Sequence, residues 1–103
     1  MNKEQLREEI INVIKTVYDP EIPVDIWELG LIYNIYISDE ANVHLRMTLT
    51  SPNCPVAESM PNEVKEKVAA IEDVKSAEVE LVWEPIWNRD MMSDEARIEL
   101  NLF

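Results

Sequence analysis

The sequence predicts a two-layer α+β domain, in which helices cover one face of a small, mainly antiparallel three-stranded sheet. Two stripes of apolar residues at three-to-four-residue spacing indicate helices, and three short runs of alternating or β-branched residues indicate strands. Their order along the chain is α-β-β-α-β, followed by a short C-terminal helix. The 103 residues contain no Gly/Ser-rich linker and no internal repeat, so we expect a single domain over residues 1–103.

The first helix is expected over residues 2–17. Its apolar side chains recur along one helical face, at Leu6, Ile10, Ile11, Val13, Ile14 and Val17. Asn2 followed by Gln5 resembles a capping box, which would satisfy free amides at the helix start. Pro20 and Pro23 end this element, because proline lacks a backbone donor and disfavours the helical region for the residue before it.

Two strands and a hairpin connection are expected next. Residues 31–37 are rich in β-branched and aromatic side chains, and residues 38–42 are polar. Residues 43–49 then alternate apolar and polar side chains, which is typical of a strand with one buried face. A third alternating segment covers residues 77–83.

The second helix is expected from Pro55 to Ile71, with a kink at Pro61. Its apolar stripe consists of Val56, Met60, Val64, Val68 and Ile71. The C-terminal helix is expected to start at Ser93, a good N-cap followed by Asp94 and Glu95, which the helix dipole favours.

Composition excludes several classes of protein. Nine basic and 21 acidic residues make the net charge −12, which argues against binding a nucleic-acid backbone or an anionic membrane surface. One cysteine cannot form an internal disulfide, so a disulfide-stabilised secreted domain is excluded. The charged N-terminus lacks the apolar core of a signal peptide, and no stretch approaches the ~20 apolar residues that span a bilayer. We therefore expect a cytoplasmic protein.

The single cysteine, Cys54, is the most informative residue. It lies between the end of the second strand and the start of the second helix, with Thr50 and Ser51 just before it. Because Pro55 suits the first helical position, Cys54 would be the N-cap, where free amides and the helix dipole stabilise a thiolate. A thiolate binds metal or attacks an electrophile. The alternative is a buried, inert cysteine that packs as a small apolar side chain.

Asp19 and Glu21 lie in a loop whose direction is restricted by two prolines, and Asp25 and Glu28 follow them. Such carboxylates can ligate a metal or exchange protons. The alternative is that they are solvated residues of a turn. In the expected fold this loop and the Cys54 loop can meet at one end of the sheet, which would place the carboxylates near Cys54.

Other candidates are weaker. His44 is expected on the polar face of a strand, and a structural zinc site needs more Cys and His ligands than one of each. With Gly30 as the only glycine, a Gly-rich phosphate-binding loop cannot form. Trp83 and Trp87 are expected either to cover part of the core or to dock a partner protein.

Three segments resemble the motifs of the SufT/PaaD-like metal–sulfur cluster assembly family. They are residues 19–33 (DPEIPVDIWELGLIY), residues 47–55 (MTLTSPNCP) and residues 79–87 (VELVWEPIW), in the family's order. The similarity covers essentially the whole chain. Because the chain lacks both an ATPase part and the extra cysteines of PaaD-type members, it resembles the stand-alone form.

The resemblance implies a non-enzymatic factor that assembles or transfers iron–sulfur clusters. By motif match, Cys54 corresponds to the family's cysteine, and Asp19, Glu21, Thr50 and Ser51 correspond to the residues grouped around it. The implied cargo is iron or an iron–sulfur cluster, held transiently or shared between chains, since a cluster needs about four thiolate-type ligands. The implied partners are other iron–sulfur assembly proteins, client apoproteins and a second copy in a homodimer.

Two other functions stay open on the residues alone. One is a small thiol enzyme in which Cys54 is the nucleophile and Asp19 or Glu21 moves protons. The other is a protein-docking module that uses Trp83 and Trp87, with Cys54 in a structural role.

Overall fold

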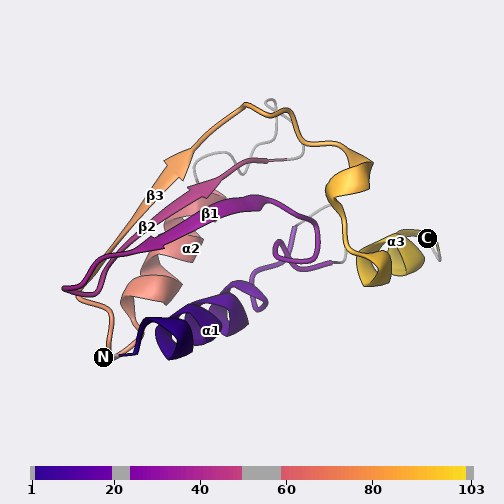
Figure 1. The fold of residues 1–103 in the computed structure, drawn as a ribbon. Coiled ribbons are helices and arrows are strands. Elements are labelled where there is room, and N and C mark those ends of the chain that lie inside the picture. Colours follow the sequence, from indigo (N-terminus) through magenta and orange to yellow (C-terminus); the bar gives the residue numbers. More distant parts are fainter. Residues whose placement is uncertain (1, 20–23, 50–58, 102–103) are drawn as a thin grey trace.

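The structure is a computed structural model that describes residues 2–19, 24–49 and 59–101. Its elements in chain order are α1 (Lys3–Ile14), β1 (Ile32–Ile37), β2 (Asn42–Met47), α2 (Ser59–Ala69), β3 (Ser76–Leu81), the 3-10 turn η1 (Arg89–Met91) and α3 (Asp94–Asn101). This order confirms the predicted α-β-β-α-β arrangement with a C-terminal helix (Figure 1).

The sheet is mixed, with strand order β1-β2-β3. β1 and β2 form an antiparallel hairpin, in which Ile35 pairs with Leu45 and Tyr36 with His44. β2 and β3 are parallel, with Leu45 beside Val79. The expectation of a mainly antiparallel sheet is corrected here, because α2 carries the chain back across the sheet before β3 begins, and such a crossover makes the two strands parallel.

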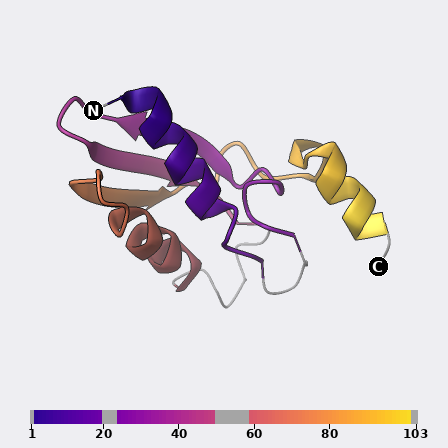
Figure 2. The same ribbon diagram turned by 90° about the horizontal axis from the view of Figure 1, so that it is seen from below.

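α1 lies under β1 and α2 lies under β3, so both helices cover the same face of the sheet (Figures 1 and 2). The core forms between these two layers. It is built from the predicted stripes: Leu6, Ile10 and Ile14 of α1, Val43, Leu45 and Met47 of β2, and Met60, Val64 and Val68 of α2. The polar residues of β2 point to the open face, which explains the alternation in the sequence.

The helix starts follow local sequence rules. Oδ1 of Asn2 accepts hydrogen bonds from the amides of Glu4 and Gln5 at 2.9 and 3.2 Å, which confirms Asn2 as the cap of α1. Pro61 lies in the first turn of α2 as described, where an amide has no intrahelical partner to lose. Residues 55–58, the expected start of this helix, lie outside the described residues.

After β3 the chain runs back over residues 28–33. The indole N–H of Trp87 donates to the Leu29 carbonyl at 2.7 Å, and the Ser93 amide donates to the Glu28 carbonyl at 2.8 Å. Ser93 Oγ accepts from the Ala96 amide at 3.1 Å, which confirms Ser93 as the cap of α3. α3 therefore packs against the loop before β1, to one side of the sheet (Figures 1 and 2).

No helix in residues 2–19, 24–49 and 59–101 is long and apolar enough to cross a membrane.

Candidate functional site

Of the five residues predicted to form the site, the structure describes Asp19. The other four, Glu21, Thr50, Ser51 and Cys54, lie outside the described residues. Asp19 is 6% exposed, which is unusual for a carboxylate because burial of a charge is costly unless it is paired. It also takes part in a polar or electrostatic interaction. A buried and engaged Asp19 is not the solvated turn residue that was the alternative for this loop.

The chain around Asp19 folds back on itself as a short antiparallel pair. The Asp19 amide donates to the Val24 carbonyl at 3.3 Å, and the Ile26 amide donates to the Val17 carbonyl at 2.9 Å. Between them, Tyr18 and Asp25 form an isolated β-bridge. These bonds hold the two ends of the Pro-containing loop next to each other.

A path of backbone hydrogen bonds connects this pair to the end of β2. The Leu31 amide donates to the Ile26 carbonyl at 3.1 Å, and the Thr48 amide donates to the Leu31 carbonyl at 2.8 Å. Thr48 and Leu49, both buried, are the last described residues before the segment that holds Cys54. The starts of the two predicted loops are thus joined through the backbone. That Cys54 lies beside Asp19 stays a prediction.

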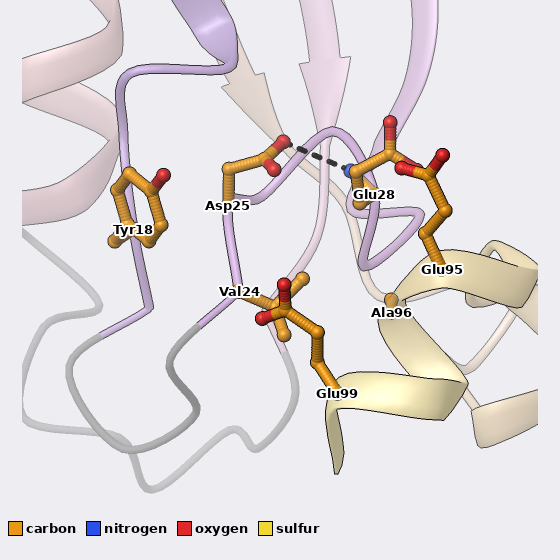
Figure 3. A pocket seen from close by; sticks show the side chains of 7 residues that line it. All are labelled: Tyr18, Val24, Asp25, Glu28, Glu95, Ala96 and Glu99. Carbon is orange, nitrogen blue, oxygen red and sulfur yellow. Dashed lines mark hydrogen bonds between the residues drawn. The ribbon is translucent and has the colours of Figure 1, made fainter.

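Apart from the five residues predicted to form the Cys54 site, the structure places four carboxylates around a cavity of about 80 Å³ between the loop and α3 (Figure 3). Asp25 and Glu28 come from the loop, and Glu95 and Glu99 come from α3. Tyr18, Val24 and Ala96 complete the lining. Among the described residues that line this cavity there is no cation, so the four carboxylates repel one another.

The balance at Asp25 is unfavourable to its charged form. Burial raises the pKa of the Asp25 carboxyl, and the Glu28 carboxylate raises it further. The Glu28 amide acts in the opposite direction, because it donates to Oδ2 of Asp25 at 3.1 Å and so lowers the pKa. The net direction is upward, so Asp25 holds its proton more tightly than a free aspartate does.

The described residues do not form a metal centre of their own. Within residues 2–19, 24–49 and 59–101, no three His, Cys, Asp or Glu side chains are placed to hold a metal ion. His44 lies on the open face of the sheet, with Nε2 3.1 Å from Oε1 of Glu80, as expected for a histidine on a polar strand face.

The two tryptophans have different surroundings. Trp87 is half-buried, packs against the core and donates its indole N–H to Leu29, so it ties the C-terminal segment to the domain. Trp83 is 40% exposed. Partner docking by this pair stays a prediction, and Trp83 has the more accessible ring.

Sequence reasoning did not connect Glu95 and Glu99 with the loop carboxylates. The four-residue spacing of Glu95 and Glu99 places both on one face of the helix, and this was the only indication in the sequence that they act together. Which part of the molecule this face meets depends on how the chain returns from β3, a long-range property that local spacing does not encode.

Comparison with known proteins assigns a family. Residues 7–81 match the family described as iron-sulfur cluster assembly protein. The chain is 48% identical over 102 residues to an Fe-S protein maturation auxiliary factor of Porphyromonas gingivalis, with 97% of each chain covered. It is 42% identical over 86 residues to the Fe-S protein maturation auxiliary factor SufT of Staphylococcus aureus, over 84% of this chain and 98% of that one.

A solved structure agrees with these sequence matches. A domain of unknown function from Bacillus anthracis superimposes with a TM-score of 0.91 at 34% identity, over 97% of this chain and 95% of that one. The fold and the sequence therefore point to the same group of proteins, and the chain belongs to the iron–sulfur cluster assembly protein family.

Proposed function

We propose that this chain is an assembly or transfer factor for iron–sulfur proteins, and that Cys54 contacts the iron or cluster during transfer. The family match over residues 7–81 carries this proposal. Relatives named as maturation auxiliary factors match along most of their own length, which supports an auxiliary role in maturation rather than catalysis.

The number of ligands limits how such a factor works. Iron–sulfur clusters are usually held by about four thiolate-type ligands, and this chain has one thiol. The cluster is therefore cargo, with its other ligands supplied by a second chain, a client protein or a small thiol. The iron content per chain after anaerobic reconstitution, with and without an added small thiol, measures this sharing.

The proposed site places Asp19 and Glu21 beside Cys54, with Thr50 and Ser51 leading into it. The backbone hydrogen bonds from Val17 to Thr48 support this arrangement, because they hold the two loop starts together. A nearby carboxylate would accept the proton that a thiol releases when it binds a metal. The partners that fit this chemistry are other iron–sulfur assembly proteins and client apoproteins, in the cytoplasm.

The test replaces Cys54 by serine in cells that depend on this protein. We expect the activity of iron–sulfur enzymes to fall to the level of cells without the protein, because serine does not supply a thiolate. The amounts of the client polypeptides should stay unchanged. Asn12→Ala, on the exposed side of α1, is the control and should support full activity.

Full maturation of every assayed iron–sulfur enzyme by Cys54→Ser would remove Cys54 from the proposed function. A titration of the Cys54 thiol tests the alternative function, a thiol enzyme in which Cys54 is the nucleophile. An ionisation near pH 8.5, as in a free cysteine, would count against an activated nucleophile.

A further inference from the structure

In residues 2–19, 24–49 and 59–101, no strand pairs with the outer edge of β1. β1 is the first strand of the order β1-β2-β3, and β2 is its one neighbour in the described sheet. The Ser38 amide donates to the Asn42 carbonyl at 2.9 Å at the hairpin end. Because bonded and non-bonded pairs alternate along an antiparallel ladder, the N–H and C=O groups of Ile35 and Ile37 point away from β2.

The side chains of β1 do not protect this edge. Its sequence, IYNIYI, has no charge and no proline, although edge strands commonly carry such residues to prevent pairing with another chain. The opposite edge differs. There β3 carries Glu78 and Glu80, which lie within 4 Å of Lys65, His44 and Arg46 as ion-pair partners.

A hollow of about 200 Å³ lies along the same edge. It is lined by four consecutive residues of β1, Ile32 to Ile35, together with Trp27 and with Arg7 from α1. Arg7 is the one charged side chain in this lining, and it forms no ion pair with the residues that the structure describes. In an acidic chain, this edge therefore combines uncharged β1 side chains with one cation, Arg7.

We propose that the outer edge of β1 binds an extended segment of a partner protein, which adds a fourth strand to the sheet. The backbone of that segment would pair with the outward groups of Ile35 and Ile37. One of its side chains would be a carboxylate placed to pair with Arg7. This surface is separate from the Cys54 loop, so it is a recognition site beyond the proposed function.

The charges favour a different protein over a second copy of this chain. Two β1 strands paired with each other would offer no carboxylate to Arg7, since IYNIYI contains none. Each copy would also bring a net charge of −12 to the contact. A short segment of another protein with one carboxylate can pair with Arg7 and does not bring a large negative charge to the contact.

Hydrogen exchange followed by NMR tests this proposal with a synthetic probe. The probe is the capped peptide Thr-Val-Glu-Val-Thr-Val, and its matched partner has Lys in place of Glu. We expect the Ile35 and Ile37 amides to exchange rapidly in the free protein and at least tenfold more slowly with millimolar Glu peptide. The Lys peptide should protect them less.

Charge variants make the test specific. Arg7→Glu should reverse the preference between the two peptides, and Arg7→Lys should retain it. Lys65→Glu makes the same charge change beside β3 and should leave the preference as in the wild type. Arg7 and Lys65 are not buried, so each variant is expected to fold, which circular dichroism checks.

Three results would overturn the proposal. One is slow exchange of Ile35 and Ile37 in the free, dilute protein, which would mean that the edge is already covered. Another is protection that rises with protein concentration alone, which would identify a second copy as the occupant. The third is no peptide-dependent protection, or a preference that Arg7→Glu does not change.

Discussion

Asp25 shows how one carboxyl responds to its surroundings. It lines the acidic cavity beside α3, and its native pKa is raised above the usual value of 3.8 by burial and by the Glu28 carboxylate. The native state therefore binds this proton more tightly than the unfolded chain does. The contribution of Asp25 to stability is present below pH 3.8 and is lost as the pH rises through the raised native pKa.

Asp25→Asn should therefore stabilise the protein at neutral pH. The amide oxygen can still accept the hydrogen bond from the Glu28 amide, while the charge is gone. Urea unfolding between pH 4 and pH 7 should show that the variant's advantage over wild type grows with pH. Asp73→Asn, in an exposed turn, is the control. A variant less stable than wild type at pH 7 would mean that the charged carboxylate makes a net favourable contact.

Two features require glycine at position 30: its backbone conformation and the close approach of Met91. Its φ is +78°, and a Cβ at this position would lie 2.3 Å from the Met91 backbone oxygen. Gly30→Ala should lower the free energy of unfolding by about 2–4 kcal/mol, since a left-handed alanine costs about 1–2 kcal/mol and the C-terminal segment must also shift. Urea unfolding measures this loss. An unchanged urea midpoint would show that the segment around Met91 can move away from residue 30 without loss of stability.

At the scale of elements, α3 depends on a few contacts. Its cap Ser93 bonds both to Ala96 and to the loop through Glu28, and the buried Met92 and Ala96 anchor its first turn. Repulsion between the loop carboxylates Asp25 and Glu28 and the α3 carboxylates Glu95 and Glu99 opposes the packing of α3 against the loop. We therefore expect α3 to open more readily than α1.

Ser93→Ala removes the cap of α3 and should destabilise that helix by about 1 kcal/mol. Hydrogen–deuterium exchange should become several-fold faster in α3, with little change in α1. Asn2→Ala is the matched variant, because it removes the cap of α1 instead. Equal acceleration in both helices after Ser93→Ala would show that α3 opens only with the whole domain.

At the scale of the whole molecule, the net charge of −12 opposes folding through self-repulsion. Salt screens such repulsion, so the melting temperature at pH 7 should rise by roughly a few degrees between low salt and 0.5 M NaCl. The effect should disappear near the sequence pI of about 4.3. A melting temperature that falls with NaCl at pH 7 would show that the surface ion pairs outweigh the repulsion.

Local patterns in the sequence were sufficient for the helices, the strands and two helix caps. The apolar stripe of α1, the alternation of β2 and the caps Asn2 and Ser93 depend on neighbours within a few residues. The family motifs likewise named Cys54 and its companions from the sequence alone, and of these the structure describes Asp19, which it buries.

The tertiary structure decided the contacts between distant segments. These include the parallel pairing of β2 with β3, the bond from Trp87 to Leu29, the approach of Met91 to Gly30 and the meeting of Glu95 with the loop carboxylates. In each case the partners are more than 30 residues apart. The physical reason is that periodicity indicates which face of an element is buried, whereas the path of the whole chain determines what that face meets.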